Sequence, residues 1–429
     1  MKRKLLLLIL FVAFSAELIA QNPGLHNSTL SQAEPVSVGV SPQRLEKIDK
    51  MIQDAIADNE IPGAVALIAR NGQIVYHKAF GTADASGRKL KKDDIFRLAS
   101  QSKAITATAV MILWEEGKFQ LDDPISKYIP EFSEPKILVN FNEKDSTFLA
   151  KPTEKQITIR HLLTHTSGLG YGIIDGDERM KKIYQKAGVT DLFTTKPISI
   201  EESVKKLAEL PLHHEPGERF TYSEGLDVLG YLIEKVSGKS FDVFLKERIF
   251  EPLGMNDTYF YLPENKKDRM VQVQQKTNNG WTKYTSTNYD PDYPVKGAKK
   301  FFSGGAGLSG TAVDYAKFLQ MYLNGGELNG TRILSRTTIK SIMGDQTGDL
   351  WGGGNKHYGL AFGVLTEKGE AAGGEGSTGT FDWGGYFNTQ YFADPEEEVI
   401  GILLKQTRGQ DNDETGWKFR QMVMASVND

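Results

Sequence analysis

The spacing of apolar residues changes from helical to strand-like near the start of the chain. Ser41 and Pro42 form a helix start, and the apolar residues at positions 45, 48, 52 and 56 lie on one helical face. Residues 64–81, AVALIARNGQIVYHKAFG, then hold two runs rich in β-branched residues around Asn71-Gly72. Because Asn-Gly is a strong signal for a tight hairpin, this segment is predicted to form two antiparallel strands.

Helical patterns dominate the middle of the chain, and strand patterns return at its end. Segments such as SVKKLAEL and GLDVLGYLIEKVSGKSFDVFLKERIF lie among long irregular loops between residues 118 and 299. Later, YGLAFGVL and TQYFADPEEEVIGILLKQ are predicted strands, the second with a turn at Asp394-Pro395. A closing helix is predicted from about Gly416.

Strand signals at both ends, with helices between them, predict an α+β fold. An antiparallel sheet would be built from residues 40–117 and 300–429 and flanked by helices, with the mostly helical region of residues 118–299 inserted. We expect these parts to form one integrated domain, residues 40–429, without internal repeats.

The first twenty residues have the composition of a secretory signal. Three basic residues, at positions 2–4, precede the apolar run LLLLILFVAF, and small residues follow it. These features predict a signal peptide over residues 1–20, cleaved after Ala20 or alternatively after Ala16. The run is short for a membrane span, which disfavours an uncleaved anchor. We therefore expect an exported protein, periplasmic or secreted, with a polar tether at residues 21–39 and no membrane attachment after cleavage.

Composition and motifs exclude several function classes. The formal net charge is −4 and no basic cluster follows residue 4, so a nucleic-acid partner is not expected. The absence of cysteine excludes disulfides, thiolate metal sites and cysteine nucleophiles. His161 and His165 have helical metal-site spacing, but HLLTH lacks the glutamate base and is interpreted as structural. GGAGLSG, residues 304–310, has the glycine spacing of a dinucleotide site without the required βαβ unit. We expect neither a metal nor a cofactor.

A lysine in an otherwise apolar helix is the first sign of chemistry. The helix is predicted from Ser100 to Trp114, and no acid stands three or four residues from Lys103. Burial without a local ion pair should lower the basicity of this ammonium. Ser100, one turn earlier, is then a candidate nucleophile with Lys103 as its proton acceptor. The simpler interpretation of Ser100 is a helix N-cap.

Two further segments could contribute to the same chemistry. Tyr222 stands just before an amphipathic helix, and with an ordinary pKa of about 10 it can act as a base only beside a cation such as Lys103. Otherwise it is a packing residue. Gly384-Gly385 is predicted to open a strand whose backbone something approaches closely, with the amide of Tyr386 facing a ligand oxygen, or else to be a β-bulge. No G-x-S-x-G motif occurs, so an α/β-hydrolase triad is not expected.

Six segments, in order, resemble the serine β-lactamase and penicillin-binding-protein superfamily, and within it the class C-like branch known as family VIII carboxylesterases. They are FRLASQSKAITA, ITIRHLLTHTSGLGYG, LPLHHEPGERFTYSEGLDVLGYLIEKVSGKSF, ERIFEPLGMNDTYFYLP, FFSGGAGLSGTAVDYAKFLQMYLNGGEL and WGGYFNTQYFADP. The resemblance spans nearly the whole mature chain and implies a β-lactamase/transpeptidase-like fold. It also implies that Ser100 is the acylated nucleophile, Lys103 its proton-transfer partner and Tyr222 the general base.

The resemblance assigns the remaining site residues as well, with two departures from the lactamase pattern. Trp383-Gly384-Gly385 occupies the place of the K-T-G element, and the amides of Ser100 and Tyr386 would form the oxyanion hole. Glu224 stands where the Y-x-N element has an amide, so Glu224, Trp383, Gly384 and Gly385 are the expected substrate-binding residues. The missing cation weakens the case for β-lactams and peptidoglycan stems, although Lys405 or Arg408 could supply one. The sequence Trp-Gly-Gly at this place is similar to that of esterases of the same branch.

The predicted function is therefore an exported serine hydrolase that cleaves small-molecule carboxylic esters through an acyl-enzyme. One alternative is an amide or lactam substrate, as for a β-lactamase, a D-aminopeptidase or a D-Ala-D-Ala carboxypeptidase. Another is an acyltransferase, in which an alcohol replaces water. A non-catalytic binding protein is the third, and the presence of Ser100, Lys103 and Tyr222 together argues against it. The sequence leaves the oligomeric state open.

Overall fold

The computed structural model describes residues 30–190, 193–278, 280–286, 289–373, 375–408 and 413–429. The predicted signal peptide and the first part of the predicted tether lie outside these residues. The end of the tether is part of the fold, because Ser31 and Gln32 pair with Gln73 and Ile74. This pairing satisfies backbone groups of an edge strand that would otherwise face solvent.

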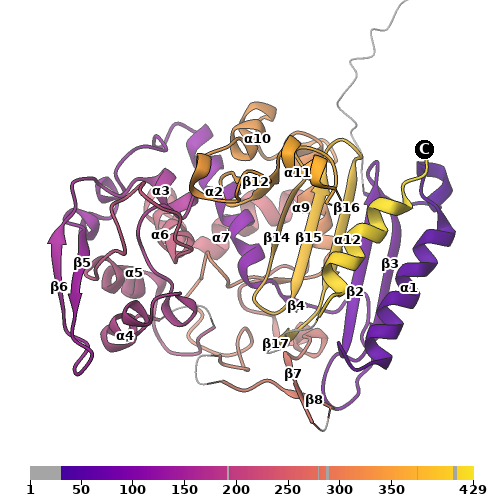
Figure 1. Ribbon diagram of the computed structural model, residues 1–429, viewed down its shortest axis with the longest axis horizontal. Helices are drawn as coiled ribbons and strands as arrows, with labels where there is room; N and C mark the ends of the chain where they lie inside the picture. The colour runs from indigo at the N-terminus through magenta and orange to yellow at the C-terminus, as the bar shows by residue number, and fades with distance from the viewer. Residues whose placement is uncertain (1–29, 191–192, 279, 287–288, 374, 409–412) are drawn as a thin grey trace, which may run out of the picture.

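An eight-stranded sheet lies in one half of the molecule, to the right in Figure 1. Its order is β1-β3-β2-β16-β15-β14-β13-β12, and every pairing is antiparallel except that of β1 with β3. The strands are β1 (Ser31–Gln32), β2 (Gly63–Arg70), β3 (Gln73–Gly81), β12 (Lys356–Tyr358), β13 (Gly363–Leu365), β14 (Phe381–Gly384), β15 (Thr389–Asp394) and β16 (Val399–Leu404). The predicted α+β class is confirmed: the two ends of the chain meet where β2 pairs with β16.

The hairpin predicted at residues 64–81 is β2 and β3. Asn71 and Gly72 both have positive φ, 51° and 67°, as the tight turn requires. Every residue of β2 is buried, and its side chains alternate between two cores: Val65 and Leu67 belong to one, and Ala66 and Ile68 to the other. The sheet is therefore covered on both faces.

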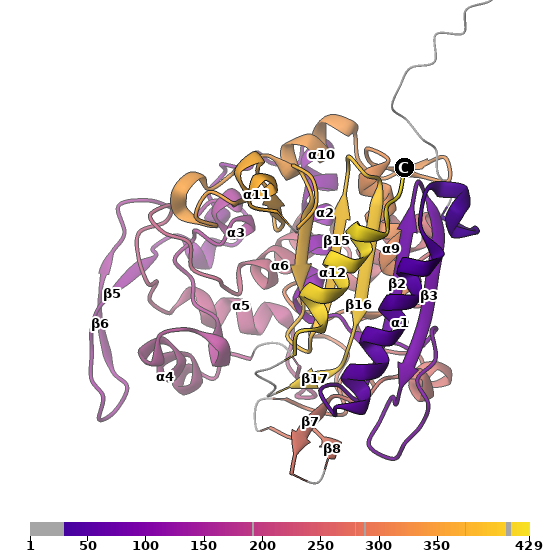
Figure 2. The same cartoon turned by 45° about the vertical axis from the view of Figure 1, so that its right-hand side comes forward.

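Helices α1 (Pro42–Ala57) and α12 (Thr415–Ser426) pack on each other and cover one face of the sheet (Figure 2). Of the apolar positions predicted for one face of α1, Leu45, Ile48 and Ile52 are buried there with Val423 of α12, and Ile56 is partly buried. The opposite face is covered by α9 (Ala312–Leu323) and α2 (Ser102–Glu115). In the described part of the chain no helix combines the length and the apolar composition needed to cross a membrane.

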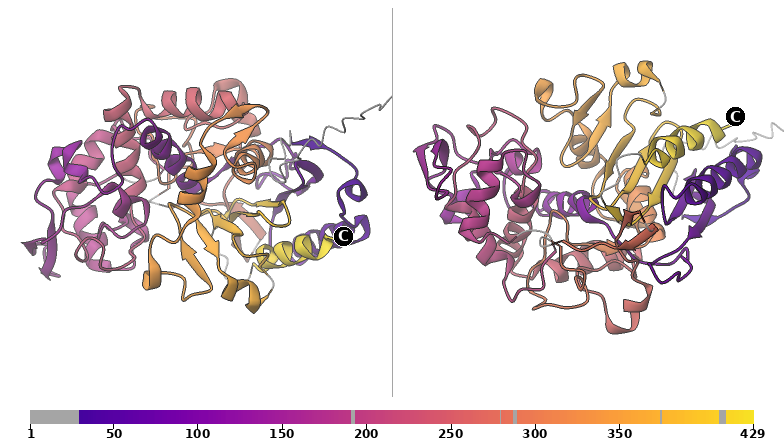
Figure 3. Two further views of the ribbon diagram at one scale, coloured as in Figure 1. Left: turned by 90° about the horizontal axis from the view of Figure 1, so that it is seen from above. Right: turned by 60° about the horizontal axis from the view of Figure 1, so that its bottom comes forward.

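The inserted region lies beside the sheet, on the far side of α2 from α1 and α12 (Figure 3). Its helices are α3 (Ile159–Leu163), α4 (Glu178–Ala187), α5 (Ile200–Ala208), α6 (Gly225–Ser237), α7 (Phe241–Leu245) and α8 (Glu251–Leu253). The remaining strands are β4 (Phe96–Arg97), β5 (Lys136–Phe141), β6 (Phe148–Pro152), β7 (Gln274–Thr277), β8 (Gly280–Lys283), β9 (Ser309–Gly310), β10 (Glu327–Leu328), β11 (Thr331–Arg332) and β17 (Thr407–Arg408), and the remaining α-helices are α10 (Arg336–Met343) and α11 (Glu367–Ala372).

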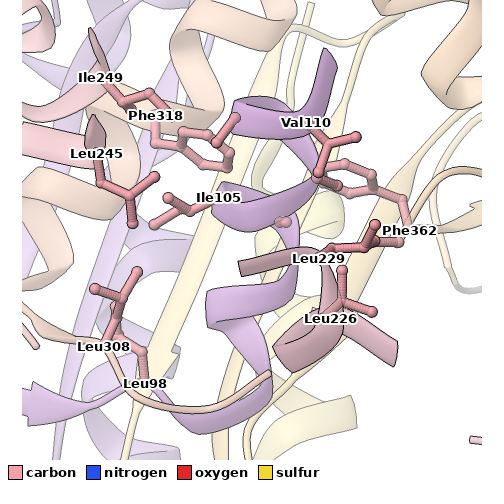
Figure 4. Packing of buried hydrophobic residues seen from close by; sticks show 14 of the residues in the cluster. Leu98, Ile105, Val110, Leu226, Leu229, Leu245, Ile249, Leu308, Phe318 and Phe362 are labelled. Carbon is pink, nitrogen blue, oxygen red and sulfur yellow. The ribbon is translucent and has the colours of Figure 1, made fainter. Parts of the chain in front are cut away.

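Helix α2 packs against both the sheet side and the inserted helices. Residues 102–113 are buried on every side, which is why the helix is apolar all round and not amphipathic. Ile105 and Val110 pack among Leu226 and Leu229 of α6 and Phe318 of α9 (Figure 4). A group at the start of α2 is thus held rigidly between the sheet and the inserted helices.

Candidate active site

Ser100 lies in a short 3-10 turn, Ala99–Gln101, that leads into α2. Ala99 has a φ of +48°, an uncommon conformation for a residue with a side chain. Such strained residues cluster at functional sites. The turn leaves Ser100 partly exposed, whereas the residues on both sides of it are buried.

Lys103 is fully buried, and its amine contacts three groups. Nζ lies 3.2 Å from the Ser100 Oγ, 3.2 Å from the Tyr171 hydroxyl and 2.7 Å from the carbonyl oxygen of Gly305. No carboxylate forms an ion pair with Lys103 among the residues that the structure describes. The amine is therefore held by neutral oxygens and aimed at the serine hydroxyl.

Tyr222 lies in the loop before α6, with its ring against Lys103. Nζ of Lys103 is 4.6 Å from the centroid of this ring, and the ring of Tyr171 stacks on it at 5.4 Å. The indole Nε1 of Trp383 donates to the Tyr222 hydroxyl at 3.5 Å. A cation over an aromatic face is a favourable contact.

His165 is the buried neighbour of Tyr222 on the other side, with ring centroids 4.5 Å apart. Its Nδ1 accepts a hydrogen bond from the Ser223 amide at 3.2 Å. Burial, and then the charge of Lys103, lower the pKa of His165 well below its ordinary value. The ring is therefore neutral, and it packs against Tyr222. Within the described residues no group of three His, Asp or Glu side chains is arranged to hold a metal ion.

The Trp383-Gly384-Gly385 segment ends β14 and turns into β15; the glycine pair was expected to open a strand. A Cβ added to Gly385 would lie 2.4 Å from the carbonyl oxygen of Leu98 and 2.2 Å from Oγ1 of Thr389. The group that closely approaches the backbone of this glycine, as predicted, is thus the main chain just before Ser100. Only a residue without a side chain lets the strand end meet the serine turn.

The amides of Ser100 and Tyr386 have no protein acceptor within the described part of the chain. Tyr386 follows Gly385 directly. The guanidinium of Arg408 stacks on the Tyr386 ring, with Cζ 3.8 Å from the ring centroid. Two free N–H groups on segments that meet at Gly385 are what an oxyanion hole requires.

Glu224 and Lys405 lie in protein surroundings, away from solvent. Glu224 is 3% exposed, and its amide donates to the carbonyl of Gly170. Burial first, and the charge of Glu224 second, raise the pKa of Tyr184. The ammonium of Lys405 is buried in an ion pair with Asp413. Glu224 is thus not exposed to a substrate in this structure, and Lys405 is not a free cation for one.

Three residues that sequence reasoning did not assign belong to the site. They are Tyr171, Gly305 and His165, which contact Lys103 or Tyr222 as described above. Tyr171 lies within ITIRHLLTHTSGLGYG and Gly305 within FFSGGAGLSG, so the resemblance had marked both segments without giving these residues a role.

The chain is similar to proteins of one known family. The family described as Beta-lactamase matches residues 48–422. The chain belongs to this family. Esterase EstB of Burkholderia gladioli is 30% identical over 88% of the chain and 95% of EstB. Lovastatin esterase of Penicillium rubens is 32% identical over 64% of the chain and 68% of that enzyme.

A solved structure agrees with these relatives. EstCE1, described as a hydrolase with promiscuous acyltransferase activity, superimposes with a TM-score of 0.75 at 27% identity, covering 90% of this chain and 99% of EstCE1. The resemblance predicted from the six segments is confirmed. The protein is a serine hydrolase, related to the β-lactamases and similar to carboxylesterases.

Proposed function

We propose that this protein is an exported serine hydrolase that cleaves carboxylic esters of small molecules through an acyl-enzyme on Ser100. The observation that carries the proposal is the 3.2 Å contact between the buried Lys103 Nζ and the Ser100 Oγ. A serine hydroxyl becomes a useful nucleophile only when a neighbouring group takes its proton. The predicted signal at residues 1–20 supports export.

In the acylation step, the proton of Ser100 passes to the pair formed by Lys103 and Tyr222 as Oγ attacks the ester carbonyl. The amides of Ser100 and Tyr386 stabilise the oxyanion of the tetrahedral intermediate. The pair returns the proton to the departing alcohol, which leaves the acyl group on Oγ. Water then attacks the acyl carbonyl and gives its proton to the same pair. The pair returns the proton to Ser100 Oγ as the acid leaves, so that serine is regenerated.

The surroundings of Ser100 favour a substrate without a carboxylate. Trp383, Gly384 and Gly385 bring no cation to the place of the K-T-G element, and Asp413 neutralises Lys405. Lys356 and Arg420, close to Trp383, are both paired with Asp382, and Arg408 is stacked on Tyr386. The names of esterase EstB and lovastatin esterase agree with ester hydrolysis. These observations favour an ester over a β-lactam or a peptide ending in D-alanine.

Acyl transfer to an alcohol is the second candidate. It needs the same residues, since an alcohol would replace water in the second step. The description of EstCE1 as a hydrolase with promiscuous acyltransferase activity supports acyl transfer as the second candidate.

The test compares nitrophenyl butyrate with a chromogenic cephalosporin. We expect kcat/KM to be higher for the ester, and Ser100→Ala to lose activity on both. Ser102→Ala is the matched control, because this neighbouring hydroxyl is buried and accepts from the Leu308 amide. A ratio below one would support the lactamase alternative, and an active Ser100→Ala variant would contradict the nucleophile.

A further inference from the structure

A buried carboxylate that the proposed mechanism does not use lies behind the catalytic lysine. Asp227 is 4% exposed and belongs to the first turn of α6, the helix that begins just after Tyr222. Its neighbours Leu226 and Leu229 pack toward α2 (Figure 4). Isolated buried carboxylates are costly, so an acid at this position requires a partner or a role.

Gly305 connects Asp227 to Lys103. The amide of Gly305 donates to Oδ1 of Asp227 at 3.4 Å, and the carbonyl of the same residue accepts from Nζ of Lys103 at 2.7 Å. A Cβ on Gly305 would lie 2.6 Å from Oδ2 of Asp227 and 3.2 Å from the Tyr171 hydroxyl. Gly305 therefore lies between the acid and the amine, where a side chain would not fit.

The charged and titratable groups around Asp227 come from three segments. Burial raises the pKa of Asp227, while the Ser303 hydroxyl, the charge of Lys103 and the amides of the 303–307 loop act in the opposite direction. Asp227 in turn contributes to the raised pKa of Tyr293, behind burial and Tyr261. Lys103 is the cation among these neighbours.

We propose that Asp227 is a positioning residue that holds the 303–307 loop through Gly305 and acts as the buried counter-charge of Lys103. Through the loop it fixes the carbonyl that orients Nζ toward Ser100. Through its charge it stabilises the protonated form of the Lys103 and Tyr222 pair. The kinetic consequence rests on the proposed ester hydrolysis, whereas the pairing of charges does not.

The kinetic experiment measures the pH profile of kcat/KM for nitrophenyl butyrate in Asp227→Asn. Removing a buried anion lowers the pKa of a neighbouring lysine or tyrosine alike, so the acidic limb should move to lower pH by about one unit. Asp314→Asn is the matched control. Asp314 is also a buried acid, on α9, and it accepts from the Asp257 amide and from Thr258. An acidic limb that stays in place in Asp227→Asn would overturn the electrostatic role.

A stability experiment tests the pairing independently of any substrate. Lys103→Met leaves the carboxylate without its counter-charge, and Asp227→Asn leaves the ammonium without one. The double variant removes both charges. We expect the double variant to melt at a higher temperature than Lys103→Met, because a buried charge left without an opposite charge nearby costs more than removing both charges.

The two experiments separate the possible failures. A higher Tm for the double variant, in a protein that hydrolyses no ester, would leave the pairing intact and contradict the proposed function. A double variant less stable than Lys103→Met would overturn the pairing, whatever the activity. This comparison holds even where Asp227→Asn alone does not fold.

Discussion

At the scale of single residues, the chemistry depends on contacts between segments that are far apart in the chain. Lys103 lies 68 residues from Tyr171 and 202 from Gly305, yet its amine contacts both. The spacing of Ser100 and Lys103 could be predicted because it is local. The oxygens that hold the amine could not, since no sequence period connects a helix to two distant loops.

Lys103 and Tyr222 are expected to act as one unit. Each of Lys103→Ala and Tyr222→Phe should lower kcat on nitrophenyl butyrate by about a thousandfold or more, and the double variant should be little worse, since both serve one proton transfer. The measurement is kcat for the two single variants and the double variant. Tyr128→Phe is a control, because its hydroxyl donates to Asp123, away from Ser100. Losses that multiply in the double variant would show independent roles.

At the scale of elements, periodicity predicted the helices and hairpins whose signals are local. The helix after Ser41 and the turn at Asn71-Gly72 occur as expected, because a proline at the first helical position and a tight turn are local signals of adjacent residues. The run YGLAFGVL was predicted as one strand and is two, β12 and β13. Ala361 has a φ of +69°, and the Gly359 amide donates to the Phe362 carbonyl, so the chain reverses within the run. An apolar run alone does not show such a reversal.

The β14–β15 turn is expected to control the oxyanion hole. Gly385→Ala would place a methyl group against the Leu98 carbonyl and Thr389, and the turn that carries the Tyr386 amide would have to shift. Losing one oxyanion donor costs about 3 kcal/mol, so kcat should fall by about a hundredfold or more. The measurement is kcat on nitrophenyl butyrate, with Tm recorded for each variant.

The matched control for this substitution is Gly344→Ala. A Cβ at Gly344, after α10, meets its nearest atoms at 3.5 Å, which is ordinary contact. We expect this variant to keep its kcat. Full activity in Gly385→Ala would place the oxyanion donors elsewhere.

At the scale of the whole molecule, the site lies where three parts of the chain meet. Ser100 and Lys103 come from the segment after the N-terminal hairpin, Tyr222 from the inserted helical region, and Trp383 from the C-terminal strands. The strand signals at both chain ends predicted the sheet class, and strands from both ends pair edge to edge in one sheet whose faces are covered by helices. The pairing of β2 with β16 joins the first and last of these parts, and the packing of α6 on α2 adds the inserted region.

The burial of His165 predicts how the stability of the whole molecule depends on pH. In the unfolded chain a histidine binds a proton below about pH 6.5, whereas burial keeps the pKa of His165 well below that value in the fold. Below about pH 6.5 the unfolded state therefore binds more protons, and the free energy of unfolding should fall by about 1.4 kcal/mol per pH unit from this residue. Urea unfolding between about pH 6 and about pH 5 measures how the free energy of unfolding changes with pH, and His165→Phe should reduce this slope by that amount.

Phe220→Leu is the control. It trims the aromatic contact with His165 at 5.6 Å without removing a titrating group, so it should lower stability and leave the slope unchanged. Equal slopes in His165→Phe and the unmodified protein would show that His165 is protonated in the fold.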